Sequence, residues 1–231
     1  TAQGDTTVQD STSHLNFLSP VNLSSCGQTG SMSGVSLNGV NQFFTRNSSL
    51  TAMPQIAGPQ TVSIWSWFPT SGRGSFPQAL TSFQYNQSAS STAIITGYYG
   101  SSSIDAYKMA SGTESDLVTT AVPSSGKWHY LVYTFNGTQS KLYVDGANTA
   151  TSALTPTSAS RYNTLYVGAD TKNSNADSLG EYFNGIVTEF RYSKIVRSAS
   201  WISTEYNNQV NPQKFVTIGN QESVSTPVTR G

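Results

Sequence analysis

The segment that decides the fold reads GKWHYLVYTFNG at residues 126–137, and KLYVDG follows at residues 141–146. Aromatic and β-branched residues fill both runs, and a short polar stretch separates them, which is typical of two β-strands joined by a turn. The second run closes on Asp145-Gly146, a dipeptide that favours a tight hairpin turn. The segment therefore predicts neighbouring antiparallel strands and, with them, an antiparallel sandwich.

Short segments of the same kind occupy most of the chain. We expect strands at residues 35–37, 42–45, 61–68, 79–85, 93–99, 104–109, 117–122, 128–135, 141–144, 164–167, 185–192 and 215–218. Clusters of Gly, Pro, Asn and Ser separate them, and Asn38-Gly39 marks a turn between the first two. About a dozen short strands with turn signals between them indicate an all-β fold of two packed antiparallel sheets.

One short helical turn is expected near residues 198–207. Ser198 can cap its N-terminus, and Trp201 and Glu205 lie four residues apart on one face. We expect Trp201 to anchor this turn to the sandwich. The turn should end before Pro212, which cannot continue a helix.

The composition excludes several classes of partner. Charged residues make up 10% of the chain and the formal net charge is +0, with no block of like charge. These values argue against binding to nucleic acid. No apolar run approaches the length of a membrane span, so we expect no membrane insertion. Ser, Thr, Asn, Gln and Gly replace the missing charge, a composition common on secreted β proteins, and we expect an extracellular or cell-surface location.

The chain is long enough, at 231 residues, for a single all-β domain with a substantial core. We expect this domain over residues 1–222 and a C-terminal tail or the start of a linker over residues 223–231. The single cysteine, Cys26, cannot form an internal disulfide and is expected to be a small buried hydrophobe.

Six segments, in order along the chain, resemble the laminin-G-like, concanavalin A-like jelly-roll domain of prokaryotic surface proteins. They are residues 6–16, 35–43, 61–65, 128–146, 183–191 and 197–209. The resemblance implies a two-sheet jelly roll. It also implies a non-catalytic recognition or adhesion domain whose partner is a glycan or surface polysaccharide.

Two features depart from the family pattern. Family members usually begin with an apolar strand before the opening loop, but only residues 1–5 precede Thr6. A sandwich that lacks one strand has an open edge, which a strand from a neighbouring chain can fill. The alternative function is therefore a structural subunit or spacer of a cell-surface filament or layer, assembled by self-association through that edge. A strand at 215–218 that covers the edge, or a shortened chain, is the simpler explanation. Thr188 is the second departure, because the family often has Asp there.

Exposed aromatic side chains are the candidate sugar contacts, since sugar faces rich in C–H groups stack on aromatic rings. The candidates outside the family's core motifs are Trp67, Tyr85, Tyr98, Tyr99 and Tyr107. For each of them ordinary core or edge packing is the alternative. Trp65 and Trp128 fall on family core positions and are expected to be structural.

A structural Ca²⁺ ion is implied by the resemblance, because many domains of this family hold one. Its candidate ligands here are Asp10 in the opening loop and Glu189, at a position that is acidic in the family. Thr188 removes one expected carboxylate, and Glu189 could instead pair with Arg191 or Lys194. The loop at residues 170–177 is rich in oxygen ligands but lacks the EF-hand spacing, so we expect it to be a solvated loop.

Catalysis is not expected. Laminarinase-type glycoside hydrolases share the jelly roll and carry the pattern Glu-x-Asp-x-x-Glu, which places carboxylates on one face of a strand. Glu114 and Asp116 match its first two positions, but Thr119 replaces the acid/base. Residues 111–113 indicate a turn, not a buried strand.

No other nucleophile is indicated. His14 and His129 form no metal or triad pattern in the sequence, and Cys26 has no neighbouring histidine. The sequence therefore predicts a protein that is not an enzyme.

Overall fold

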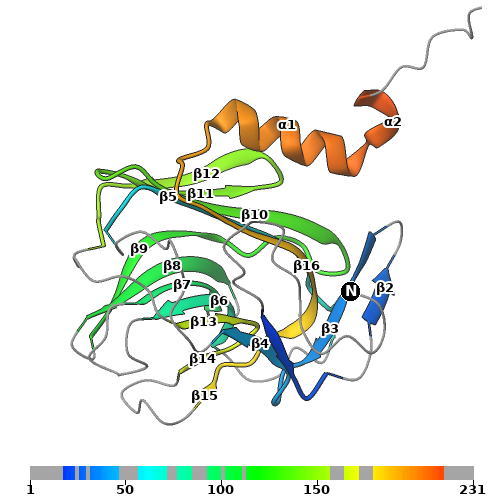
Figure 1. Ribbon diagram of the computed structural model, residues 1–231. Helices are drawn as coiled ribbons and strands as arrows, with labels where there is room; N and C mark the ends of the chain where they lie inside the picture. The colour runs from blue at the N-terminus through cyan, green and yellow to red at the C-terminus, as the bar shows by residue number, and fades with distance from the viewer. Residues whose placement is uncertain are drawn as a thin grey trace, which may run out of the picture.

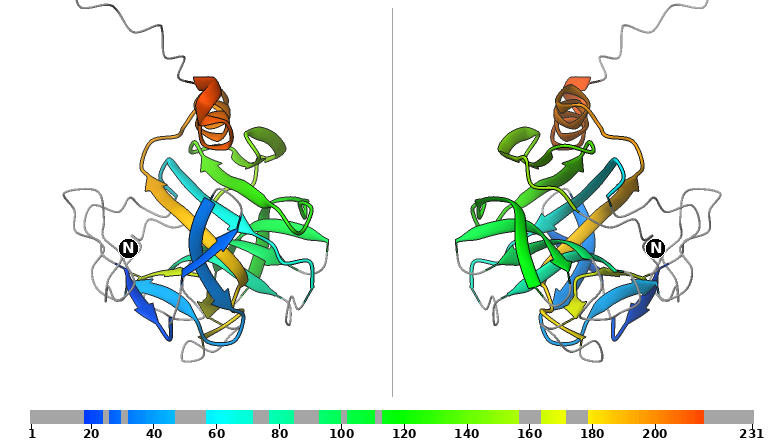
Figure 2. Two further views of the ribbon diagram at one scale, coloured as in Figure 1. Left: turned by 90° about the vertical axis from the view of Figure 1, so that its right-hand side faces the viewer. Right: turned by 90° about the vertical axis from the view of Figure 1, so that its left-hand side faces the viewer.

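The computed structural model describes residues 18–23, 26–29, 32–46, 57–71, 77–84, 93–99, 102–110, 113–156, 164–171 and 179–215. These residues form two seven-stranded antiparallel sheets packed face to face, with one long helix lying across the outer side of one sheet (Figures 1 and 2). The predicted all-β, two-sheet jelly-roll sandwich is confirmed.

The first sheet has the strand order β1-β4-β13-β6-β7-β8-β9. Its strands are β1 (Ser19–Val21), β4 (Phe43–Arg46), β13 (Thr164–Val167), β6 (Gln78–Gln84), β7 (Ala93–Tyr99), β8 (Ser103–Ala110) and β9 (Thr113–Ala121). The second sheet has the order β12-β11-β10-β5-β16-β3-β2. Its strands are β12 (Ala147–Ser152), β11 (Ser140–Val144), β10 (Trp128–Phe135), β5 (Gln60–Trp67), β16 (Asn184–Ser193), β3 (Met32–Asn38) and β2 (Cys26–Thr29). A short pair, β14 (Asp170–Thr171) and β15 (Leu179–Gly180), lies beside them.

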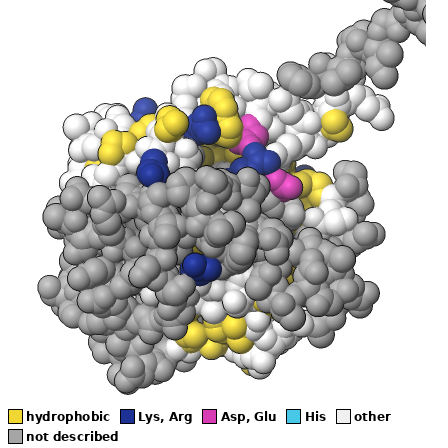
Figure 3. Space-filling model, in the orientation of Figure 1, with side chains coloured by type: hydrophobic (Ala, Val, Ile, Leu, Met, Phe, Trp, Pro, Cys, Tyr) yellow, Lys and Arg dark blue, Asp and Glu magenta, His cyan; other side chains and the backbone are white. Residues whose placement is uncertain are grey.

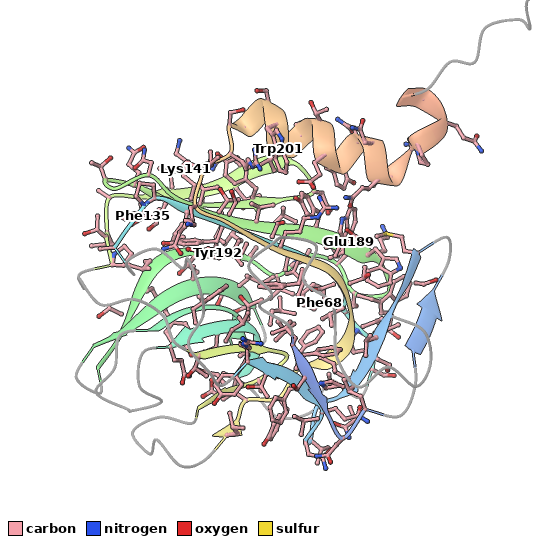
Figure 4. The ribbon with its side chains drawn as sticks, viewed as in Figure 1. Phe68, Phe135, Lys141, Glu189, Tyr192 and Trp201 are labelled. Atoms are coloured by element: carbon pink, nitrogen blue, oxygen red, sulfur yellow. The ribbon has the colours of Figure 1, made fainter. Side chains whose placement is uncertain are left out.

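The core lies between the two sheets and is filled by alternate residues of their strands. On β5, Val62 and Ile64 point into it, and Leu80 of β6 is fully buried. Phe68 and Phe183 meet edge to face with their ring centroids 5.7 Å apart. Figure 4 shows Phe68 and Tyr192 in the space between the sheets. This period-2 pattern is what the sequence alternation predicts for strands with one face in a core.

Both predicted tight turns are present. Asp145 and Gly146 have φ of 53° and 80°, as a two-residue hairpin turn requires, and they join β11 to β12. Gly39 has φ of 69°, and the Asn38 side chain accepts hydrogen bonds from the backbone N–H groups of Val40 and Asn41 at 2.9 and 3.1 Å.

Some boundaries differ from the sequence prediction. Strand β9 begins at Thr113, four residues before the expected start, because its first residues pair with the end of β8. The strand expected at 215–218 is wrong at Phe215, which ends a short helix, α2 (Pro212–Phe215); residues 216–218 lie outside the described residues. Proline suits the first position of a helix because its missing N–H would have no intrahelical partner there.

The helix α1 (Ala199–Val210) is longer than the single turn expected at 198–207. Ser198 caps it as predicted, since its Oγ accepts a hydrogen bond from the backbone N–H of Trp201 at 3.1 Å. The expectation that Trp201 anchors the helix is wrong. Trp201 is 36% exposed with the Arg197 guanidinium 4.4 Å from its ring centroid, whereas Ile202 is fully buried. The step of one residue rotates a helical side chain by about 100°, which a short pattern of apolar residues does not resolve.

Aromatic rings and polar contacts hold α1 on the second sheet. Trp65 of β5 stacks on Tyr130 and on Tyr206 of the helix, with ring centroids 5.2 and 5.7 Å apart. The buried carboxylate of Glu205 accepts a hydrogen bond from the Tyr130 hydroxyl and forms an ion pair with Arg191. Figure 3 shows acidic and basic side chains adjoining beneath the helix. In the part of the chain that the structure describes, no helix is long and apolar enough to cross a membrane.

Replacing Ile202 by alanine should destabilise the fold by about 3 kcal/mol, because it leaves a cavity beneath the helix. Trp201→Ala, at the adjacent position, should cost under about 1 kcal/mol, since Trp201 is 36% exposed and loses mainly its contact with Arg197. Urea unfolding followed by circular dichroism measures both. A larger loss for Trp201→Ala than for Ile202→Ala would contradict the orientation of α1.

Candidate functional site

A row of polar side chains covers the outer side of the first sheet, facing away from the core. On β8, Ile104 and Ala106 point into the core, so the alternate residues Asp105 and Tyr107 point outward. The register places Asp116 of β9 opposite Tyr107. We define the polar face by Ser82, Gln84, Asp105, Tyr107, Asp116 and Asp170.

Asp170 is the best-satisfied member of the polar face. Its carboxylate accepts hydrogen bonds from Ser82 Oγ at 2.7 Å, Gln84 Nε2 at 2.6 Å and the Tyr107 hydroxyl at 3.0 Å. The residue is only 2% exposed. Because these donors come from β6 and β8, the carboxylate fastens β14 onto the first sheet.

Asp105 is equally buried but less well satisfied. Its side chain is 2% exposed, and Ser103 Oγ donates to Oδ2 at 3.2 Å, while Oδ1 has no hydrogen-bond partner. Burial, together with the charge of Asp116, raises the pKa of Asp105, although the Thr119 and Ser103 hydroxyls act in the opposite direction.

The end of β9 that carries Glu114 and Asp116 is a strand, so the turn expected at residues 111–113 is wrong at Thr113. Residues 111–112 lie outside the described residues. A register shift between Ala106 and Tyr107 brings both Asp116 and Thr119 onto the outer side of the sheet. The Glu-x-Asp-x-x-Glu pattern therefore falls on the polar face, and the Thr119 hydroxyl stands where the pattern has its third carboxylate.

The predicted aromatic contacts do not gather in one place. Tyr107 is 5% exposed, with its hydroxyl bound to Asp170. Trp67 lies on the outer side of the second sheet, where it meets Trp128 edge to face at 6.0 Å. Tyr85 lies outside the described residues, and for Tyr98 and Tyr99 only the backbone is described, paired with Ile104 and Ser103 of β8. Trp65 and Trp128 pack in one apolar cluster that includes Ile202 of α1, which agrees with the structural roles expected for both tryptophans.

The expected calcium ligands are also apart from the polar face. Asp10 lies outside the described residues. Glu189 of β16 is half exposed and pairs with Arg191 at 2.6 Å, which is the alternative that the sequence left open (Figure 4). The described parts of the chain contain no group of three or more His, Cys, Asp or Glu side chains able to hold a metal ion.

His129 takes part in a chain of contacts that the sequence did not indicate. Nδ1 lies 2.8 Å from Asp145 Oδ2, and Nε2 lies 2.7 Å from the Ser124 carbonyl oxygen and 3.4 Å from its Oγ. The connectivity is that of a Ser-His-Asp triad, but both ring nitrogens face acceptors. When the ring is protonated, Nδ1 donates to Asp145 and Nε2 donates to the Ser124 carbonyl, which is closer to Nε2 than the Ser124 hydroxyl is.

The chain belongs to the concanavalin A-like lectin/glucanases superfamily, whose laminin-G-type model matches residues 44–203. No curated protein matches the chain in sequence. Among solved structures, domain 4 of an extracellular GH43 arabinanase from Geobacillus stearothermophilus, in complex with arabinotriose, is similar with a TM-score of 0.55 and 13% identity, covering 78% of this chain and 79% of that one.

Two larger proteins contain a similar fold. Trypanosoma rangeli sialidase in complex with sialic acid gives a TM-score of 0.60 at 15% identity, covering 85% of this chain and 30% of the sialidase. A mutant of HCR/D gives 0.63 at 14% identity, covering 87% of this chain and 49% of that one. At these identities the likeness establishes the fold, and this chain corresponds to half or less of both larger proteins.

The contacts of His129 predict a dependence of stability on pH. Burial alone would lower the pKa of His129, but the hydrogen bond and charge of Asp145, with the Ser124 carbonyl, outweigh it and raise the pKa above its usual value. The stabilisation should therefore be fully present below the ordinary histidine pKa of about 6.5 and be lost as pH rises through the folded-state pKa. Urea unfolding at a series of pH values, compared with His129→Gln, measures it. Parallel profiles for the two proteins would contradict the assignment.

Proposed function

We propose that the chain is a non-catalytic recognition or adhesion domain that binds a glycan or surface polysaccharide on the polar face of the first sheet. The observation that carries the proposal is the exposed carboxylate of Asp116 and the exposed hydroxyl of Thr119, which lie beside a hydrogen-bonded set of carboxylate, amide and hydroxyl groups on the side of the sheet that points away from the core. Buried polar groups outside a core are unusual, and convergent polar groups of these types are what fix a sugar's hydroxyls.

The geometry of a sheet suits this task. The polar face is built on β6, β8 and β9, whose ladders hold the backbone and the hydrogen-bonded side chains in place before a ligand arrives. A site prepared in this way loses less conformational entropy on binding. The superfamily includes lectins, and the similar arabinanase domain was solved with a bound arabinose oligosaccharide, which supports a carbohydrate partner.

Two observations support a role without catalysis. Thr119 takes the position at which a glycoside hydrolase of this fold would need a carboxylate, and a hydroxyl at that position is no acid/base near neutral pH. The nearest partner of His129 Nε2 is the Ser124 backbone carbonyl at 2.7 Å and not the Ser124 hydroxyl at 3.4 Å, so no serine nucleophile is aligned with this ring. An extracellular or cell-surface location is part of the proposal and rests on the neutral polar composition.

Binding should depend on Asp116, the exposed carboxylate of the polar face. Asp116→Asn should weaken the affinity for a bound oligosaccharide about three- to tenfold, because it removes a charged acceptor while leaving the fold intact. The affinity is measured by calorimetry with the strongest ligand from a glycan array. Trp67→Ala, on the opposite side of the sandwich, is the matched control and should bind as the original protein does. The reverse pattern would move the site to the second sheet, and an array without any bound glycan would refute the proposal.

A second candidate function is a structural subunit assembled by strand addition. The edge strand β12 carries no charged residue and no proline over Ala147–Ser152, and most of its residues are exposed. Charged residues and prolines on an edge strand usually prevent it from pairing with a strand of another chain. The bulge near Asn148 protects one end of the strand, which leaves the stretch from Ala150 to Ser152 able to pair with a neighbouring strand.

Light scattering distinguishes this second candidate. If β12 mediates assembly, the protein should form species larger than its 24.7 kDa monomer, and Thr151→Lys should return them to monomers, because an exposed lysine on the edge disfavours pairing. A monomer at all concentrations would remove the assembly hypothesis and leave the binding proposal unchanged.

A further inference from the structure

Basic side chains from separate parts of the sequence lie on the outer side of the second sheet, at the end where α1 begins. Thr61 alternates with the core residues of β5, so it points outward, and directly paired residues share its side: Thr134 of β10 and, beyond it, Lys141 of β11. Thr61 Oγ1 donates to the backbone carbonyl of Ile195 at 2.8 Å and accepts from the backbone N–H of Arg197 at 2.9 Å. The loop from β16 to α1 is therefore held at the same end of the sheet as Lys141.

The side chains gathered there are accessible to solvent. Lys194 is exposed, Ile195 is 62% exposed and Trp201 in the first turn of α1 is 36% exposed. Lys141 and Arg197 are half-buried. We define the basic surface by these five residues. Figure 4 shows Lys141 and Trp201 on the same side of the second sheet, and Figure 3 shows basic and hydrophobic side chains next to one another there.

No described carboxylate neutralises the three cations of the basic surface. The described part of the chain contains three salt bridges, and none of them includes Lys141, Lys194 or Arg197. The glutamates of β16 and α1 both pair with Arg191 instead. Because the whole chain has a formal net charge of +0, the basic surface is a local concentration of positive charge that complements an anionic partner.

The apolar members of the basic surface decide which anionic partner fits. The Arg197 guanidinium lies 4.4 Å from the ring centroid of Trp201, which holds both side chains in place before a partner arrives. Ile195 presents an aliphatic side chain beside them. An acidic polymer neutralises the cations but gives this aliphatic side chain little to contact. A lipid bilayer takes cations among its headgroups and tryptophan and aliphatic side chains just below them.

We propose that the basic surface binds the headgroup layer of a membrane that contains anionic lipids. Lys141, Lys194 and Arg197 contact lipid phosphates, and Ile195 and Trp201 enter the boundary between headgroups and acyl chains. The contact is peripheral, and no element of the fold crosses the bilayer. The second sheet faces the membrane in this arrangement, and the polar face of the first sheet points away from it.

Co-sedimentation of the full chain with vesicles tests the proposal. Vesicles of phosphatidylcholine alone are compared with vesicles of equal parts phosphatidylcholine and phosphatidylglycerol. Binding should be at least about tenfold tighter to the anionic vesicles. It should weaken as salt is added, because exposed charges act over about 8 Å at physiological ionic strength. Tryptophan emission should shift to the blue on binding, and Trp201→Ala should abolish this shift.

Matched variants assign the binding to the basic surface. Lys141→Gln and Lys194→Gln should each weaken binding to anionic vesicles about fivefold, which is the contribution of one cation near such a membrane. Ile195→Ser should weaken it about two- to fivefold through the loss of buried apolar area. The controls are Lys127→Gln, at the opposite end of β10 from Thr134, and Val40→Ser, in the turn after β3. Both positions are exposed, and both variants should bind within about twofold of the original protein.

Three results would overturn the proposal. The first is equal binding to neutral and anionic vesicles, or binding to neither. The second is a loss of binding in the controls as large as that in Lys141→Gln and Lys194→Gln. The third is retention on polygalacturonate or polyglutamate without binding to vesicles and with no effect of Ile195→Ser, which would identify an acidic glycan or an acidic protein as the partner. Each result leaves glycan binding on the first sheet open to its own test with Asp116→Asn.

Discussion

The buried carboxylate of Glu205 ties helix α1 to the second sheet, and the helix covers part of the outer side of that sheet as a result. Glu205 accepts a hydrogen bond from Tyr130 of β10 and pairs with Arg191 of β16, so one helical side chain reaches two strands. Burial is the main cause that raises the pKa of Tyr130, so the Tyr130 hydroxyl stays protonated and can donate its hydrogen bond. A buried charge needs such partners, and an apolar residue at this position would not fix where the helix lies.

A stack of three aromatic rings also holds α1 against the second sheet. Trp65 lies between Tyr130 and Tyr206, and its Nε1 donates to Gln209 on the helix. Gly146 in the hairpin turn allows the close approach, because a Cβ there would lie 3.1 Å from the Cβ of Tyr206. Strand β5 is therefore buried on both faces over most of its length, and the outer side of the second sheet is largely occupied by the protein's own helix. On the outer side of the first sheet, most of the described polar groups are buried, and Asp116 and Thr119 of β9 are the exposed ones among them.

The sequence was informative wherever local chemistry decides the structure. The strands at 128–135 and 164–167 have the predicted bounds, the Asp145-Gly146 and Asn38-Gly39 turns form, and Ser198 caps the helix. These features depend on residues near one another in the chain. Strand β12 was missed because Ala147–Ser152 contains no large apolar residue and is held by its pairing with β11. Trp201 was assigned to the wrong side of α1, because a single aromatic residue does not define the buried face of a helix.

The polar face could not be predicted for a different reason. Asp170 meets Ser82 and Tyr107 over separations of 88 and 63 residues, and the missing partner of Asp105 is a property of the packed sheet and not of its neighbours in sequence. The carboxylate pattern at Glu114 and Asp116 lies on a strand of this face, although residues 111–113 in the sequence indicate a turn before it. The aromatic content of the sequence predicts a site of stacking residues, whereas the fold brings hydrogen-bonding groups together on the first sheet.

The central claim is that ligand binds on the polar face of the first sheet. It is tested most directly by mapping amide chemical-shift changes in the isotope-labelled protein on titration with its best glycan ligand. The account predicts that the largest changes fall on β8 and β9, around Asp105, Tyr107 and Asp116, while β5 and α1 change little. Changes concentrated around Trp67, Trp128 and α1, with β8 and β9 unaffected, would contradict it.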